Sequence, residues 1–228
     1  MKGKLYGIGV GPGDPELLTM KAVRIIQSCD VVIAPSAMAG GESIALDITK
    51  GYILESTETQ ILHFPMGTAD REDKIYAAYQ IVESYLLEGK TVAFLTIGDP
   101  FVYSTYIYLL EHFRGEGYDI ETVPGITSFC ASASIAGVPL VIGDENLLIL
   151  PGNKIEEVEE QPYIVIMKVY KQEEKIIDHL ESKGYTYTYI KRAGREGQEV
   201  LTDKEAIKNN REYMALIIAS KIMGTVPN

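Results

Sequence analysis

The chain has 228 residues, of which 46% are hydrophobic, and a formal net charge of −11 at pH 7. This apolar content is enough for a substantial core in one large domain or two small ones. The excess of acidic residues argues against nucleic acid or an anionic membrane surface as a partner. Because no apolar run is as long as a membrane span and the first residues have the pattern of a strand rather than a signal peptide, we expect a cytoplasmic protein.

Cysteine and histidine are sparse in this sequence. Two cysteines, Cys29 and Cys130, are too few for a disulfide framework or a metal cage, which fits a reducing compartment. His63, His112 and His179 are isolated from one another in sequence, so we expect packed or surface side chains rather than ligands. We therefore expect no protein metal site.

The first part of the chain alternates strand and helix patterns. Residues 4–10 are predicted to form a strand, and a glycine-rich turn then leads to Pro15, which suits a first helical turn with Asp14 as its N-cap. That helix is expected to end near Ser28. Further strands are predicted at 31–34 and 60–64, and further helices at 43–48 and 74–87. Repeated strand–helix units predict a largely parallel sheet.

Two nucleotide-binding motifs are approximated but not completed. In a dinucleotide fingerprint starting at Gly7, Pro12 occupies the place of the last glycine, and no acidic residue follows the second strand. The run Gly89-Lys90-Thr91 is similar to the end of a P-loop, but Ser84 replaces its first glycine and the run precedes a strand. Neither motif predicts a nucleotide site.

The stretch from Val92 to Tyr106 is the most informative in the sequence. A buried strand ends in Gly98-Asp99-Pro100, and helical spacing resumes through Phe113. A strand that ends in such a turn and leads into a helix is typical of the edge where α/β sheets bind ligands. A glycine lets a ligand approach the backbone, and Asp99 is a charge placed either for such a ligand or as the cap of the next helix.

The remainder of the chain contains more strand and less helix. A strand at 119–123 precedes a helix of small residues at 129–136. Later strands are predicted at 163–167, 185–190, 199–201 and 214–219, with helices at 154–161 and 172–182. We therefore expect two α/β domains, residues 1–115 with a mostly parallel sheet and residues 116–228 with a mixed sheet.

Five motifs in order resemble those of the tetrapyrrole methyltransferase family, whose members transfer methyl groups from S-adenosylmethionine. They are Gly9 to Pro15, Gly98 to Pro100, Pro124 to Ser128, Val165 to Lys168, and Arg192 to Gly194. Additional stretches are similar to the members that methylate carbon 20 of precorrin-2 or cobalt-factor II in cobalamin synthesis. These are Glu42 to Leu46, Phe64 to Met66, Phe101 to Tyr106, Pro139-Leu140, and Gly143 to Glu145.

The resemblance implies a homodimer of two-domain subunits, with the cofactor in the cleft between the domains and S-adenosylhomocysteine as a product. It implies that Pro12 shapes the floor of the cleft. The expected contacts to the methionine side of the cofactor are Gly98, Asp99, Val102 and Tyr103. The expected contacts to the remainder are Thr127, Ser128, Met167, Ala193 and Ala215.

Two residues are candidates for a catalytic role in this family's chemistry. Asp99 would either orient the cofactor or help a proton leave the methylated carbon, and Tyr103 would orient cofactor or substrate unless it only packs its helix. The substrate that the resemblance implies is a polycarboxylate, so basic side chains are expected to offset its charge, unless they only form a solvated face. The candidates are Arg71, Lys168, Lys191, Arg192 and Arg195.

Other functions stay open on the same motifs. The fold also serves enzymes that methylate a different tetrapyrrole carbon, uroporphyrinogen III, or a protein in the diphthamide pathway. A module that binds a tetrapyrrole or a nucleotide without chemistry is the alternative outside the enzymes. Acceptors with and without cobalt both remain open.

Overall fold

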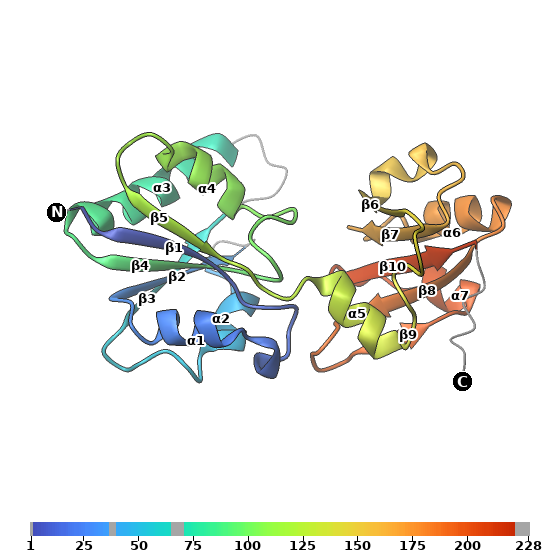
Figure 1. Cartoon of the computed structure of the whole chain (residues 1–228), viewed down its shortest axis with the longest axis horizontal. Helices are drawn as coiled ribbons and strands as arrows, with labels where there is room; N and C mark the ends of the chain where they lie inside the picture. The colour runs from blue at the N-terminus through green and yellow to red at the C-terminus, as the bar shows by residue number, and fades with distance from the viewer. Residues whose placement is uncertain (1, 37–39, 65–70, 222–228) are drawn as a thin grey trace. The chain divides into compact units, whose positions relative to one another are not determined.

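The structure, a computed structural model, describes residues 2–36, 40–64 and 71–221, with only the backbone of residues 71–74. Pro65 and Met66 of the Phe64–Met66 motif lie outside the described residues. The chain divides into two compact units, Met1–Thr127 and Ser128–Asn228 (Figure 1). No helix in the described part of the chain is long and apolar enough to cross a membrane.

The first unit contains a sheet of five parallel strands in the order β3-β2-β4-β1-β5. Their bounds are β1 Lys4–Gly9, β2 Val31–Ser36, β3 Glu58–His63, β4 Thr91–Thr96 and β5 Asp119–Val123. The central strands are buried along nearly their whole length, because helices cover both faces of the sheet. This confirms the predicted parallel sheet.

Helices lie on both faces of this sheet (Figure 1). The short helix η1 Pro15–Leu17, with α1 Met20–Ile26 and α2 Ile44–Thr49, lies on one face, and α3 Arg71–Leu87 and α4 Tyr106–Phe113 cover the other. Asp14 caps η1 as predicted, and its Oδ1 accepts a hydrogen bond from the backbone N–H of Glu16 at 2.8 Å. The single helix that we expected after Pro15 is divided, because Leu18 is extended and Thr19 caps a separate helix.

The boundary between the units lies later than the expected start at residue 116. Strand β5 pairs in parallel with β1, with Leu5 opposite Ile120, and therefore belongs to the first sheet. The contacts divide the chain between Thr127 and Ser128 instead. Sequence composition loosens around residue 116, but strand pairing decides the boundary.

The second unit contains a mixed sheet in the order β6-β7-β10-β8-β9. Only β6 Leu147–Pro151 and β7 Tyr163–Met167 are parallel neighbours. Strand β10 Ala215–Ser220 runs antiparallel to β7 and to β8 Thr186–Lys191, and β9 Glu199–Leu201 runs antiparallel to β8. The mixed sheet is as predicted, although β6 was not expected.

Each face of the second sheet has its own helical cover (Figure 1). Helix α5 Ser128–Ala136 packs on β8 and β10 on one face. On the other face lie η2 Gly152–Glu157, α6 Glu173–Ser182 and α7 Lys204–Lys208. The α-helix expected over 154–161 is the shorter 3₁₀ helix η2, and α7 was not predicted.

Candidate functional site

The topology of the first unit gives β1 and β4 the arrangement at which open α/β sheets usually bind ligands. These neighbouring strands are parallel, but the chain leaves β1 toward α1 on one face and leaves β4 toward α4 on the other. Loops that diverge in this way leave a crevice at the carboxyl ends of the two strands, the usual ligand position in open α/β sheets. The glycine-rich turn and the Gly98-Asp99-Pro100 turn meet at this point.

Two glycines join the turns directly. The backbone N–H of Gly98 donates to the carbonyl oxygen of Gly11 at 2.7 Å, and the N–H of Gly11 donates to the carbonyl of Gly98 at 3.3 Å. Both residues have a positive φ, 75° at Gly11 and 72° at Gly98, a conformation that glycine adopts without steric strain. The glycines therefore fix how the two loops meet.

A third loop, which follows β5, packs against these two without intervening side chains. A Cβ atom on Gly125 would lie 2.1 Å from the carbonyl oxygen of Gly98, and one on Gly9 would lie 2.5 Å from the backbone nitrogen of Gly125. Such distances leave no room for any side chain. The three loops therefore pack backbone against backbone at the carboxyl edge of the sheet, which only glycine allows at these positions.

Asp99 holds these loops in place. Its Oδ1 accepts a hydrogen bond from the backbone N–H of Phe101 at 2.9 Å, and its Oδ2 accepts one from Gly125 at 3.1 Å. Asp99 is not the cap of the following helix, because the N-cap residue of α4 is Thr105. The carboxylate thus ties the loop after β4 to the loop after β5.

The other predicted residues of the first unit surround this junction. Pro12 is buried in the glycine-rich turn, and Val102 and Tyr103 follow Asp99, with Tyr103 about half exposed. Tyr103 has a φ of 49°, a region that non-glycine residues seldom adopt and that is frequent at functional sites. Thr127 closes the unit, and its buried Oγ1 has no hydrogen-bond partner among the described residues.

The predicted residues of the second unit gather at one end of its sheet. Met167 ends β7, Ala215 begins the neighbouring strand β10, and Ala193 follows the end of β8. Because β10 lies between β7 and β8 and runs antiparallel to both, these positions share one edge. The adjacent residues Lys168 and Arg192 have φ values of 56° and 48°. Ser128, in contrast, is the first residue of α5.

The basic candidates differ in their surroundings. Lys191 pairs with Glu199 at 3.1 Å, and Arg192 Nε donates to Glu212 at 2.6 Å. The guanidinium of Arg195 has no carboxylate within ion-pair distance among the residues that the structure describes. Lys168 follows β7 and is exposed. Arg71 begins α3, and its side chain lies outside the part of the structure that is described.

Glu212 is the residue of this region that sequence reasoning missed. It stands in the loop before β10, outside every motif, and an isolated glutamate gives no signal in a single sequence.

Cys29 and Cys130 are free thiols. Within the described part of the chain, no group of three His, Cys, Asp or Glu side chains is placed to hold a metal ion.

Comparisons with known proteins agree with this geometry. The family model for tetrapyrrole (corrin/porphyrin) methylases matches residues 4–207. A probable cobalt-precorrin-2 C(20)-methyltransferase of Methanocaldococcus jannaschii is 38% identical over 96% of both chains. A precorrin-2 C(20)-methyltransferase of a Sinorhizobium species is 33% identical and covers 95% of this chain and 94% of its own length.

Solved structures show the same fold. A cobalt precorrin-4 methyltransferase superimposes with a TM-score of 0.75, 22% identity and coverage of 95% of this chain and 94% of that one. The uroporphyrin-III C-methyltransferase of Thermus thermophilus in complex with S-adenosylhomocysteine gives a TM-score of 0.74, 21% identity and coverage of 96% and 98%. The predicted pair of α/β domains of this type is confirmed, and the chain belongs to the tetrapyrrole methylase family.

Proposed function

We propose that the chain methylates carbon 20 of precorrin-2 or of its cobalt-containing counterpart, with S-adenosylmethionine as the donor. The observation that carries this proposal is the similarity, over nearly the whole chain, to relatives named C(20)-methyltransferases, at 38% and 33% identity. The five motifs support it, since each of them lies at a strand end or a helix start of the two units. We also infer, from the family resemblance, a homodimer in the cytoplasm.

The residues at the carboxyl edge of the first sheet suit the cofactor. The backbones of Gly9, Gly98 and Gly125 pack directly on one another and hold the three loops together there, and the buried hydroxyl of Thr127 lacks a partner that a ligand could supply. When bound, S-adenosylmethionine supplies an activated methyl group on a positively charged sulfur. The residues that would hold it are Pro12, Gly98, Asp99, Val102, Tyr103, Thr127, Ser128, Met167, Ala193 and Ala215.

The chain's own contribution to the reaction is alignment and the exclusion of water. Alignment of two reactants supplies about 7–11 kcal/mol of a barrier in favourable cases, so a conspicuous nucleophile is not needed. Both carboxylate oxygens of Asp99 accept backbone hydrogen bonds, which supports its orienting role over proton removal. Tyr103 is the second candidate for orientation, since its partly exposed side chain follows directly from this turn.

The substrate's carboxylates need cationic partners. Arg195 is the strongest candidate among the basic residues, because Lys191 and Arg192 are already paired with Glu199 and Glu212. An arginine guanidinium binds a carboxylate through two parallel hydrogen bonds, which favours it for this contact. Cobalt, where present, would arrive as part of the substrate.

The deciding experiment is an anaerobic incubation with S-adenosylmethionine and, separately, precorrin-2, cobalt-precorrin-2 and cobalt-factor II. The product mass and the position of the new methyl group are measured. One methyl group added at carbon 20 supports the proposal, and the preferred acceptor identifies the metal state of the substrate. A methyl group at another carbon would refute methylation at carbon 20 but not methyl transfer itself. Cofactor binding without transfer to any acceptor would favour a binding module.

A further inference from the structure

Glu212 connects the two segments of the second unit that carry Ala193 and Ala215. Its Oε2 accepts a hydrogen bond from Nε of Arg192 at 2.6 Å, and its Oε1 accepts one from the backbone N–H of Met214 at 3.1 Å. The Glu212 side chain is only 17% exposed. The carboxylate thus spans the loop after β8 and the start of β10.

A backbone hydrogen bond completes the connection. The N–H of Arg192 donates to the carbonyl oxygen of Met214 at 2.8 Å, so Arg192 is attached through both its backbone and its side chain. Arg192 has a φ of 48°, and a non-glycine residue in this region is held there by its surroundings at a cost in free energy. The contacts to Glu212 and Met214 supply this constraint.

The charge of Glu212 is retained at neutral pH. Partial burial of the carboxyl acts to raise its pKa, but the hydrogen bonds from the Met214 backbone and from Arg192 outweigh burial and lower the pKa below its ordinary value. The hydrogen bond to Arg192 is therefore one between two charged groups, which is stronger than a neutral hydrogen bond.

We propose that Glu212 is a positioning residue for the cofactor, because it fixes the segment that carries Ala193 against the segment that carries Ala215 at one end of the second sheet. This inference rests on the proposed function, in which both alanines contact S-adenosylmethionine. Ala193 directly follows Arg192, and Ala215 directly follows Met214, so each is one residue from a clamped position. Asp99 has the equivalent task in the first unit, where its carboxylate joins two loops.

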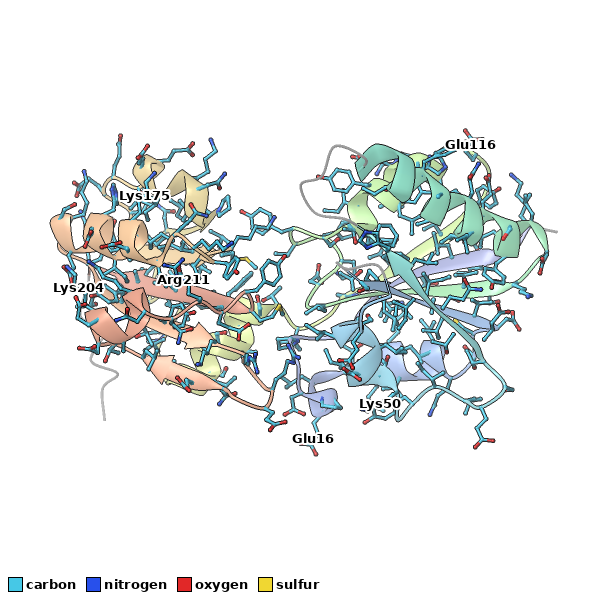
Figure 2. All side chains as sticks on the ribbon, turned by 180° about the vertical axis from the view of Figure 1, so that it is seen from behind. Glu16, Lys50, Glu116, Lys175, Lys204 and Arg211 are labelled. Carbon is cyan, nitrogen blue, oxygen red and sulfur yellow. The ribbon has the colours of Figure 1, made fainter. Side chains whose placement is uncertain are left out.

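The test compares two variants that break the same contact from opposite sides. Glu212→Gln removes the charge, and Arg192→Lys keeps the charge but removes the Nε donor. The control is Glu156→Gln, which breaks the Lys175–Glu156 ion pair of 2.9 Å between exposed side chains of the same unit; Lys175 extends from α6 in Figure 2. Affinity for S-adenosylhomocysteine is measured by calorimetry, the melting temperature by thermal denaturation, and KM and kcat by methyl transfer.

We expect both variants to lower cofactor affinity about tenfold, which corresponds to about 1.4 kcal/mol. The KM for S-adenosylmethionine should rise in parallel in both variants, while kcat at saturating cofactor and the KM for the tetrapyrrole stay unchanged in Glu212→Gln. Glu156→Gln should bind the cofactor as the wild type does.

Unchanged cofactor affinity in Glu212→Gln or Arg192→Lys, or an increase confined to the tetrapyrrole KM, would overturn the positioning role. If either variant does not fold, the other still decides, since each removes one half of the contact between the Nε donor of Arg192 and the charged carboxylate of Glu212. Wild-type protein that binds no S-adenosylhomocysteine would instead refute the proposed function.

Discussion

Asp99 and Gly125 are joined by a hydrogen bond of 3.1 Å, although 26 positions separate them in the sequence. They follow β4 and β5, which are not neighbours in the sheet but lie on either side of β1. The contact is possible because Gly9, at the end of β1, has no side chain to separate the two loops. The carboxylate of Asp99 therefore reaches past β1 to the loop after β5, and the close packing of Gly9, Gly98 and Gly125 allows this contact.

Replacing Asp99 by asparagine should weaken cofactor binding. The amide keeps one acceptor oxygen but turns an N–H₂ group toward a backbone donor, so one charge-assisted hydrogen bond of about 1.5–3 kcal/mol is lost. We expect affinity for S-adenosylhomocysteine to fall about tenfold in calorimetry. The matched control is Asp47→Asn, which removes an exposed ion pair of 3.5 Å with Lys50; Lys50 is labelled in Figure 2. Unchanged binding and turnover in Asp99→Asn would remove Asp99 from the site.

A methyl group on Gly125 should disrupt the junction of the loops. Its Cβ would lie 2.1 Å from the carbonyl oxygen of Gly98, and since that contact is to backbone, the loops must move apart. We expect Gly125→Ala to lower the free energy of unfolding by about 1–3 kcal/mol in a denaturant titration and to abolish cofactor binding.

Gly51→Ala is the control for this substitution. No atom lies within 4 Å of a Cβ at Gly51, and the residue does not have a positive φ, so its alanine variant should be as stable as the wild type or slightly more stable. Equal stability and binding in Gly125→Ala would show that the loops are not packed as described.

Much of the site was predictable from sequence because its parts are local. A buried strand, a glycine turn and a helix follow one another here along the chain. A strand that ends in such a turn before a helix indicates that the turn lies at the carboxyl edge of the sheet, where ligands bind in open α/β sheets. The cap at Asp14 is local in the same sense. Such features depend on neighbouring residues and are therefore readable from one chain.

The features that sequence reasoning missed depend on distant pairing or on very short elements. The domain boundary follows from the pairing of β5 with β1, and the role of Glu212 follows from the approach of β8 and β10. Helix α7 has five residues, too few to show a helical period, and β6 is a short apolar run that periodicity alone does not assign. For the domain boundary and for Glu212, the order of the strands in the sheet decides the outcome, and a single sequence does not reveal that order.

Stability in acid should depend on Glu121. Hydrogen bonds from Lys21 and Lys4, at 2.6 and 2.9 Å, lower the pKa of this carboxyl from 4.5 to about 2. Because the folded state has the lower pKa, the stabilisation is present above pH 4.5 and is lost as the pH falls toward 2. Glu121→Gln should therefore lower the melting temperature at pH 7 and make it less dependent on pH in this acid range.

Glu16→Gln serves as the control, because Glu16 extends from the surface of the first unit (Figure 2) and has no ion pair among the described side chains. Its melting temperature should follow that of the wild type at every pH. If Glu121→Gln did the same, the contacts to the two lysines would contribute nothing to stability.

The two thiols should react at very different rates. Burial and, to a smaller extent, the neighbouring Asp30 raise the pKa of Cys29 to about 12, and its side chain is 5% exposed within the core of the first unit. Thiolates are the reactive form, so at pH 8 a disulfide reagent should modify the exposed Cys130 quickly and Cys29 only after unfolding. Cys130→Ser should abolish the fast phase, and a fast phase that persists in this variant would contradict the burial of Cys29.

Thr127 allows ligand binding to be separated from folding. Its buried Oγ1 has no partner among the described residues, so Thr127→Val, which keeps the shape of the side chain, breaks no hydrogen bond of the free protein. The free energy of unfolding should therefore stay the same or rise. If the hydroxyl contacts the cofactor, affinity should fall by about three- to tenfold, since a hydrogen bond contributes a net 0.5–1.5 kcal/mol.

Thr96→Val is the matched control for this prediction. The hydroxyl of Thr96 is likewise buried and unpaired within the described part of the chain, but side chains alternate along β4, and Thr96 shares the face of Phe94 that packs against α3 and α4. This variant should match Thr127→Val in stability and the wild type in cofactor affinity. A loss of affinity in Thr127→Val alone would assign the hydroxyl to the cofactor, because both variants remove a buried hydroxyl that has no partner among the described residues. Equal affinity in both variants would place the Thr127 hydroxyl outside the cofactor site.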